Sequence, residues 1–344
     1  MLDLPSGGVR IWLRFEGRRL ACRRCGTVKT EGLPWLADNP HFTRRFALYV
    51  GRLCREMTVK RVAGLLHLTW HPVKDLEKQY MQAVLAKAPQ PRPRAIGIDE
   101  VSLRKRHTYR VLVTDLDAKR PIWFGGAGRK VEDLDQFFAA LGPAKTAALE
   151  IAVMDMWKPF RASTAKHAPQ VRIIFDKFHV LRHLGNALDA VRKSEYRRVA
   201  EKDRAFIKGQ KYTLLSARAN LDLEARQALR KLLKANRRLH TAYLLKESFG
   251  QLWSYRREGS ARRFFEHWRA QLRWQRLPSY EKFAAMIDRH WDGIAAYCRP
   301  ENKVSLGFVE GVNNKVRVIQ RRAYGLRDEE YLRLKILTAF LPEL

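Results

Sequence analysis

The chain has 344 residues, of which 67 are Lys or Arg and 35 are Asp or Glu, so its formal net charge is +32. With 46% hydrophobic residues it is not a disordered chain, and its length allows two or three packed domains. It lacks an apolar run of about 18 residues, a secretory signal pattern and enough cysteines for a disulfide framework, so we expect a cytoplasmic protein. The charge predicts a polyanionic partner, first of all nucleic acid, with a generically basic protein as the alternative.

The first 40 residues combine a strand pattern with a cysteine pair. Alternating apolar residues over 9–15 predict a strand that leads towards Cys22 and Cys25. Two cysteines at this spacing supply half of a tetrahedral zinc site, so we interpret residues 1–40 as a partial zinc-ribbon-like segment that could hold Zn²⁺. The alternative is a pair of ordinary turn cysteines.

Residues 41–87 change to a helical pattern. Thr58 is expected to cap one helix, and a break over 67–69 precedes a second, so we predict a helix-turn-helix DNA-binding domain, with an ordinary helical hairpin as the alternative. Three prolines within residues 88–94 then predict an extended linker. If the second helix reads DNA, its contacts are expected to be Thr69, Trp70, His71, Lys74 and Lys78.

Residues 95–179 alternate strands with helices. A meander of three strands followed by helix, strand, helix and strand predicts a mixed sheet. The strands are expected at 95–98, 109–115, 121–124, 148–154 and 171–175.

The rest of the chain is predicted to be helical. Residues 180–300 form an all-helical basic segment, and residues 301–344 return as a long helix that carries Glu310, a turn at Tyr324 and Gly325, and a closing apolar helix. Four tryptophans of the basic segment are expected in its core, with stacking on nucleic-acid bases as the alternative: Trp253, Trp268, Trp274 and Trp291.

Three acids occupy positions that suit chemistry. Asp99 and Asp155 each end a strand, and Glu310 lies on the helix that follows the sheet. Acids at the ends of strands meet at one edge of a sheet, and clustered carboxylates favour bound Mg²⁺ or Mn²⁺, of which two ions together can cleave a phosphodiester. Taken singly, each acid is explained as well by a helix cap or a turn.

The distribution of charge supports an enzyme that acts on a polyanion. The basic surplus is +11 over residues 1–98 and +16 over 177–300, but only +3 over 99–176. Basic surfaces can hold the polyanion while the carboxylates between them hold cations.

Four blocks of the sequence resemble the signature blocks of DDE transposases, and most of all the bacterial insertion-sequence family ISL3. They read IGIDE over 96–100, MDMWKPF over 154–160, FDKFHV over 175–180 and GFVEGVNNK over 307–315. The resemblance implies an α/β plus α fold: an RNase H-like mixed-sheet core, interrupted by an all-helical insertion and preceded by a zinc ribbon and a helix-turn-helix. It also implies a nucleoid-associated protein whose partners are double-stranded DNA, as transposon terminal inverted repeats and target DNA, and a second copy in a homodimer on DNA.

The resemblance assigns the catalytic residues. Asp99, Asp155 and Glu310 would hold two Mg²⁺ or Mn²⁺ ions for hydrolysis at the element end, after which the freed 3′-OH would attack target DNA. Asp176 and His179 lie in the third block, so Asp176 is an alternative second acid, or the two residues support the site. The strand order favours Asp155.

The resemblance also concerns two further groups of residues. The family carries a second cysteine pair upstream of Cys22, which this chain lacks, so the zinc site is in doubt. Residues beyond Glu310 are candidate DNA contacts, although the two asparagines could instead position the helix end, and a solvated basic face explains the charged residues equally well. These candidates are Asn313, Asn314, Lys315 and Arg317.

Two other functions fit the same residues. One is a catalytically inactive, transposase-derived DNA-binding regulator, which would bind DNA without metal-dependent cleavage. The other is a structure-specific RNase H-like nuclease, which would cut branched DNA without strand transfer.

Overall fold

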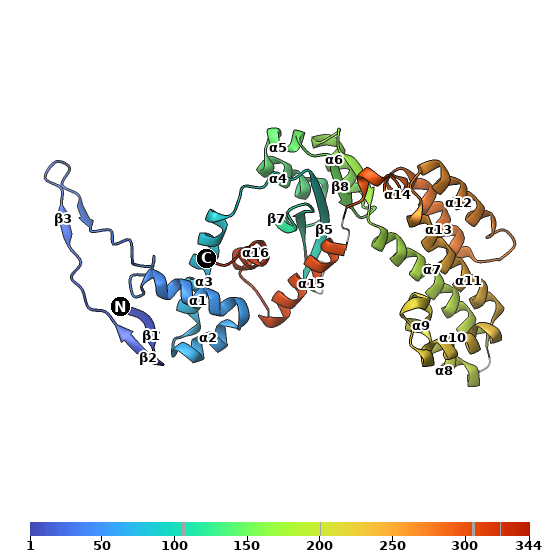
Figure 1. Ribbon diagram of the computed structural model, residues 1–344, viewed down its shortest axis with the longest axis horizontal. Coiled ribbons are helices and arrows are strands. Elements are labelled where there is room, and N and C mark those ends of the chain that lie inside the picture. Colours follow the sequence, from blue (N-terminus) through green and yellow to red (C-terminus); the bar gives the residue numbers. More distant parts are fainter. Residues whose placement is uncertain (105–107, 200, 305–306, 324) are drawn as a thin grey trace.

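The computed structural model describes residues 1–104, 108–199, 201–304, 307–323 and 325–344. The molecule is elongated: hairpins and helices of the N-terminal part lie at one end, a sheet lies in the centre, and a helical part extends from the sheet to the other end (Figure 1). Within these described ranges, no helix is both long and apolar enough to cross a membrane.

The N-terminal part consists of two small hairpins and three helices. Strands β1 (Leu2–Ser6) and β2 (Val9–Trp12) pair with each other, as do β3 (Arg19–Ala21) and β4 (Val28–Thr30). The helices are α1 (Arg44–Glu56), α2 (Val59–Leu66) and α3 (Trp70–Lys87).

The expected cap and break between helices are both present. The Thr58 hydroxyl accepts a hydrogen bond from the Arg61 backbone N–H at the start of α2. His67 ends α2 in the left-handed region, with φ 52° and ψ 45°, and so turns the chain into α3. Buried apolar side chains of all three helices form one core, among them Phe46, Val62 and Leu76.

The central sheet has five strands: β5 (Ala95–Arg104), β6 (Thr108–Asp115), β7 (Arg120–Gly125), β8 (Ile151–Met154) and β9 (Arg172–Phe175). Their order is β7-β6-β5-β8-β9. The first three strands form an antiparallel meander, and β8 and β9 run parallel to β5, so the predicted mixed sheet is confirmed. Helices connect β7, β8 and β9: α4 (Val131–Leu141), α5 (Pro143–Ala147) and α6 (Lys158–His167).

Helices occupy the chain from α7 to α14, and together they form the arm at one end of the molecule (Figure 1). Their core is aromatic: Trp268, Tyr280 and Phe265 are all at most 1% exposed. The α-helices are α7 (Lys177–Arg198), α8 (Glu201–Gly209), α9 (Lys211–Leu215), α10 (Leu223–Ala235), α11 (Arg237–Phe249), α12 (Glu258–Ala270), α13 (Pro278–Arg289) and α14 (Trp291–Ala296), with 3-10 turns at Arg218–Asn220, Gly250–Ser254 and Pro300–Asn302.

One tryptophan of this arm contradicts the expectation that all four are in the core. Trp268 is 1% exposed, and Trp253 and Trp291 pack against the core, but Trp274 is 84% exposed. Trp274 lies between α12 and α13 in the left-handed region, with φ 70°, so the turn directs its side chain outward.

Two helices complete the chain. Helix α15 (Gly307–Arg322) packs on β5 through Val309, and α16 (Glu329–Thr338) packs on both α3 and β7. Gly325, with φ 110°, lies in the turn between them as expected, whereas Tyr324 lies outside the described residues.

The contact between α16 and α3 contains buried polar groups. The carboxylate of Glu77, which is 3% exposed, accepts hydrogen bonds from the Tyr331 hydroxyl and the Lys335 ammonium. Apolar side chains surround these groups, among them Tyr80, Met81 and Leu334. The three-helix unit is therefore joined to the C-terminal helices by a satisfied buried polar network.

Candidate active site and DNA-binding elements

Three aspartates lie side by side at one edge of the sheet because of the register of its parallel strands. Ile98 of β5 is opposite Met154 of β8, which in turn is opposite Phe175 of β9. The next residues along the chain are Asp99, Asp155 and Asp176, respectively. Asp155 and Asp176 directly follow β8 and β9, but the expected end of the first strand at residue 98 is wrong, because β5 continues through Asp99 to Arg104 in its pairing with β6. The three acids therefore lie side by side where the parallel pairing of β5, β8 and β9 ends, which is the place where open α/β sheets commonly bind ligands.

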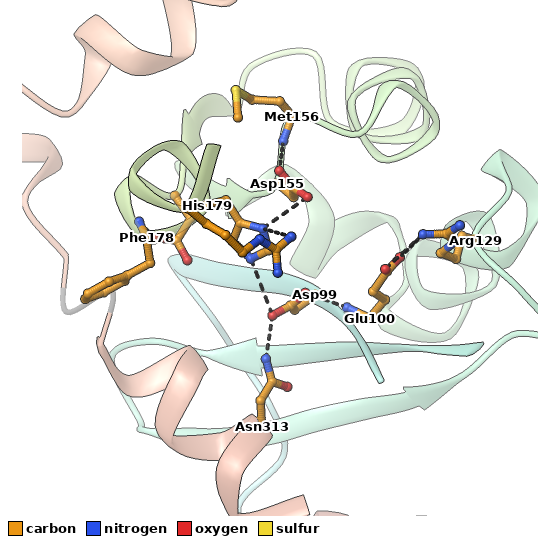
Figure 2. A network of polar contacts seen from close by, with 10 residues as sticks. Asp99, Glu100, Arg129, Asp155, Met156, Phe178, His179 and Asn313 are labelled. Carbon is orange, nitrogen blue, oxygen red and sulfur yellow. Dashed lines mark hydrogen bonds and ion pairs between the residues drawn. The ribbon is translucent and has the colours of Figure 1, made fainter. Parts of the chain in front are cut away.

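His179 joins two of these acids. Its Nδ1 lies 3.1 Å from an oxygen of Asp155, and its Nε2 lies 4.0 Å from an oxygen of Asp99 (Figure 2). Asp176 positions His179, because its carboxylate caps α7 by accepting the backbone N–H of Phe178 at 2.9 Å. The first turn of α7 then directs the imidazole towards Asp155 and Asp99.

Asp99, Asp155, Asp176 and His179 form the acid cluster, and helix α15 contacts this cluster through Asn313. The Asn313 amide N–H donates to the carboxylate of Asp99 (Figure 2). Glu310 lies three residues earlier on α15, so it projects from the same side of the helix one turn closer to its start, and it is exposed.

The charges of the cluster act on one another. Burial raises the pKa of Asp99 above its ordinary value, although His179, the Glu100 backbone N–H and Asn313 oppose the shift. Burial also raises the pKa of Asp155, but the hydrogen bond and charge of His179 outweigh it, so the pKa is lowered. Burial lowers the pKa of His179, but Asp155, Asp99 and Asp176 together raise it. Asp155 and His179 are therefore favoured as carboxylate and imidazolium.

The residues of this edge suit a hard divalent cation. Asp99 and Asp155 supply carboxylate oxygens, and the Oδ1 of Asn313 is a buried oxygen without a hydrogen-bond partner among the described residues. Carboxylate and amide oxygens are ligands that Mg²⁺ and Mn²⁺ accept. No group of three or more Asp, Glu, His or Cys side chains with metal-binding geometry is found in the part of the chain that the structure describes.

The structure thus brings together some of the predicted site residues but not all of them. Asp99, Asp155 and His179 are in mutual reach, and Asp176 acts on them through its charge and its cap. The side-chain amide of Asn313, one of the predicted site residues, donates to Asp99. Glu310 lies on the helix that Asn313 joins to the cluster.

Sequence reasoning missed a second group next to the acids. Glu100 binds the guanidinium of Arg129 at 2.9 and 3.2 Å, and the Trp157 indole N–H donates to the Arg129 carbonyl at 2.8 Å. Glu100 and Trp157 stood in the quoted blocks beside Asp99 and Asp155. The positions of Glu100 and Trp157 next to the acids could have indicated that they belong to the site. Arg129 lies outside the four sequence blocks, so no sequence pattern pointed to it.

The helix-turn-helix presents some predicted DNA contacts to solvent and not others. Thr69, Trp70 and His71, at the start of α3, are exposed. Lys74 and Lys78 face α16 instead, where their ammonium groups lie 2.7 and 3.5 Å from the same oxygen of Asp328. These two lysines therefore contribute to the contact between α3 and α16.

A cavity separates the helix-turn-helix from α15. Its volume is about 1420 Å³, and Trp70 and Lys74 line one side, while Lys315 of α15 lines another. Asn314 and Arg317, also predicted to contact DNA, are exposed on α15, and the Arg317 guanidinium donates to Asn314 at 2.9 Å.

The cysteine pair lies at the tip of the β3–β4 hairpin. Cys22 and Cys25 are both exposed free thiols, and the turn is closed by the Gly26 N–H, which donates to the Cys22 carbonyl. Contacts with the Thr27 hydroxyl and backbone lower the pKa of the Cys25 thiol. A lower pKa favours the thiolate form that binds metal ions.

The chain is similar to known transposases. A family model described as a transposase, of the DDE type of ISL3, matches residues 96–336, and one described as the helix-turn-helix domain of transposase family ISL3 matches residues 31–81. The chain is 34% identical over 341 residues to the transposase for insertion sequence element IS1001 of Bordetella parapertussis, covering 98% of this chain and 83% of that protein.

A second relative is more distant. The transposase for insertion sequence element IS1557 of Mycobacterium tuberculosis is 27% identical over 361 residues, covering 96% of this chain and 79% of that protein. The two family matches and these relatives extend over both the helix-turn-helix and the sheet that carries the acids. The chain therefore belongs to the ISL3 family of insertion-sequence transposases.

Proposed function

We propose that this protein cuts DNA at the ends of an insertion sequence and joins the freed ends to target DNA, using divalent metal ions. The observation that carries the proposal is the cluster at the sheet edge. Asp99 lies within β5, Asp155 directly follows the adjacent parallel strand β8, both contact His179, and Asn313 ties α15 to Asp99. The strand order β7-β6-β5-β8-β9 supports an RNase H-like core.

We assign Asp99, Asp155 and Glu310 as the catalytic acids. Asp155 is favoured over Asp176 because its carboxylate contacts His179, which also faces Asp99, whereas that of Asp176 is used as the cap of α7. When bound, Mg²⁺ or Mn²⁺ ions supply Lewis acidity that makes water a better nucleophile and stabilises charge on the phosphate. Asp99 and Asp155 would hold them, with Glu310 approaching from α15.

The reaction has two balanced steps. In the first, a water oxygen bonds to phosphorus at the element end as the bond to the 3′ oxygen breaks, which leaves a 3′-OH and a 5′-phosphate. In the second, that 3′-OH attacks a phosphodiester of the target in line, so one P–O bond forms as another breaks. His179 would orient Asp155 and, as an imidazolium, reduce the repulsion between Asp155 and Asp99 before DNA and metal bind.

The helix-turn-helix would hold the terminal inverted repeats. Its exposed residues Thr69, Trp70 and His71 begin α3, which is the second helix and the one that such motifs place in the major groove. Asn314, Lys315 and Arg317 would contact phosphates near the active site. Lys74 and Lys78 would contribute less, because Asp328 neutralises part of their charge.

The remaining assignments follow from family membership. We propose a homodimer assembled on two element ends, and a place on the bacterial nucleoid in the cytoplasm. We also propose that the helices from α7 to α14 form an insertion in the core. Cys22 and Cys25 would form half of a zinc site.

A cleavage assay tests the proposal. Purified protein is incubated with DNA that carries both ends of its element, with Mg²⁺ or Mn²⁺, and nicks and joined products are resolved on a sequencing gel. Asp99→Asn, Asp155→Asn and Glu310→Gln should each lower the rate by about 10³-fold or more while DNA binding persists. Asp117→Asn is the control, because Asp117 is an exposed carboxylate paired with Arg94.

The alternatives are distinct outcomes of this assay. Salt-dependent binding without cleavage would replace the proposal with an inactive DNA-binding regulator. Cleavage of branched DNA without joining would replace it with a structure-specific nuclease. Full activity of Asp155→Asn together with inactivity of Asp176→Asn would move the second catalytic acid to Asp176.

A further inference from the structure

Two half-exposed aromatic side chains flank the acids. Trp157, two residues after Asp155, is 39% exposed, and Phe178, two residues after Asp176, is 38% exposed. Figure 2 shows Phe178 on one side of the cluster and Arg129, which stacks on Trp157, on the other. What distinguishes these two rings from other exposed aromatic side chains is their place in the sequence, since each lies two residues after an acid of the cluster.

On one side of the cluster, the Arg129 guanidinium stacks on the rings of Tyr109 and Trp157. The Arg129 guanidinium lies between two rings, 4.3 Å from the centre of Tyr109 and 4.8 Å from that of Trp157, and Glu100 fixes it with two contacts. The only polar group of Trp157, its indole N–H, already donates to the Arg129 carbonyl. What Trp157 can offer a ligand is therefore the π surface of its ring.

On the other side of the cluster, the Phe178 ring also has a cation beside it. The ammonium of Lys177 lies 5.3 Å from the centre of the Phe178 ring. The Phe178 backbone N–H is held by the Asp176 cap, and its ring points away from His179 (Figure 2). Each side of the cluster thus presents an aromatic ring with a cation beside it.

This combination fits a single strand of nucleic acid. Every base has a π face that can stack on an aromatic ring, and cations beside the ring attract the backbone phosphates. Inside a duplex, however, the faces of paired bases are covered by their neighbours. A ring at the active site can therefore capture a base only after that base has left its pair.

Resting on the proposed function, we infer that Trp157 and Phe178 are stacking platforms for unpaired bases on the two sides of the phosphodiester that is cut. The DNA strand would enter the site locally single-stranded. Arg129 and Lys177 would position the adjoining phosphates, and Glu100 and Tyr109 would act as positioning residues through Arg129.

The first test compares two substrates under the same conditions: a fully paired element end and the same end with a short mismatch at the cut. Trp157→Ala and Phe178→Ala should each slow cleavage of the paired end by about 5- to 150-fold, which corresponds to the loss of one base stack. The mismatch should restore a rate close to wild type, because it supplies the unpaired bases. Trp157→Phe should retain most activity, since it keeps a ring.

The matched control is Trp274→Ala, which removes an 84% exposed tryptophan between α12 and α13 of the helical arm, and this variant should cleave both ends like wild type. The inference is overturned if Trp157→Ala and Phe178→Ala cut the paired end at the wild-type rate, or if the mismatch fails to restore their activity. Asp99→Asn should be inactive on both substrates, which separates the loss of chemistry from the loss of stacking.

A second test does not need cleavage. 5-Iododeoxyuridine placed on either side of the expected cut is irradiated in the metal-free complex, and the crosslinked residue is identified by mass spectrometry. Iodouracil crosslinks to the aromatic ring on which it stacks, so we expect Trp157 and Phe178. If the wild-type protein cuts neither substrate, the proposed function fails, and crosslinks at other residues then overturn the inference as well.

Discussion

Gly97 sets the distance between α15 and the sheet, and this distance controls the candidate active site. A Cβ atom built on Gly97 would lie 2.6 Å from a methyl carbon of Val309 and 3.1 Å from one of Leu116. Ordinary contacts of this kind are 3.4–4 Å. In Gly97→Ala either the Val309 side chain or its helix must shift by about 1 Å. Because Val309 is buried and β-branched and has little freedom to rotate, we expect α15 to move outward together with Asn313 and Glu310.

Two effects of Gly97→Ala follow from this displacement. Overpacking of a buried contact costs about 1–3 kcal/mol, measurable by urea unfolding. If Asn313 and Glu310 move about 1 Å further from Asp99, the cleavage rate should fall by about 10²-fold, because catalytic groups tolerate little misplacement. At a temperature where Gly97→Ala is fully folded, the lower stability no longer affects the measured rate. The cleavage rate of the variant should still be lower than that of wild type under these conditions.

Matched variants test the cause. Val309→Ala removes the methyl group that a new Cβ would strike, so the double variant should recover activity, with a coupling energy of about 1–3 kcal/mol. Gly311→Ala adds the same Cβ to the same helix in open space and should leave cleavage unchanged. Full activity of Gly97→Ala, or no recovery in the double variant, would refute the role of this contact.

Three further predictions concern the other contacts of the fold. Tyr331→Phe leaves an oxygen of the buried Glu77 carboxylate without its donor and should lower the free energy of unfolding by about 1–3 kcal/mol in urea titrations, with an unchanged value contradicting the network. Lys74 and the Tyr331 backbone N–H lower the pKa of Asp328 to about 2. The contribution of the Asp328 carboxylate to folding stability is therefore fully present above the unfolded pKa near 4 and is lost as the pH falls towards 2. Because Asp328 is about a third exposed, the free energy of unfolding of wild type should exceed that of Asp328→Asn by only about 1 kcal/mol at pH 6. If the same difference in unfolding free energy persists at pH 2, the ion pair is not its cause. Trp268→Ala should cost about 3–5 kcal/mol by thermal unfolding, since this side chain is 1% exposed, and a loss below about 1 kcal/mol would mean that the helical arm can repack.

The sequence predicted the features that depend on neighbouring residues. Apolar runs that end in an acid located Asp99 and Asp155, because strand periodicity is a local property. The break at His67 was predictable for the same reason. The predicted end of the first strand at residue 98 was wrong, since pairing with β6 extends β5 to Arg104. The positions of the acids at a common edge followed from the parallel pairing that helical crossovers impose.

What the sequence did not predict depends on contacts between distant residues. Asn313 reaches Asp99 across 214 positions of sequence, and no local pattern distinguishes that role from contact with DNA. Lys74 and Lys78 looked like solvent-facing residues of a recognition helix, but α16, more than 240 residues later, supplies Asp328 to them. Trp274 was expected in a core because aromatic residues usually are, whereas a left-handed turn directs it outward.

The most direct test of the central claim is the location of Mn²⁺ in crystals soaked with that ion, read from its anomalous scattering. We expect Mn²⁺ between Asp99 and Asp155, with Glu310 and the free oxygen of Asn313 turned towards it. Loss of the anomalous peaks in Asp155→Asn crystals should accompany loss of cleavage. Mn²⁺ bound by Asp176 and not by Asp155, or an active enzyme in which neither Asp99 nor Asp155 binds the ion, would contradict the assignment of the active site.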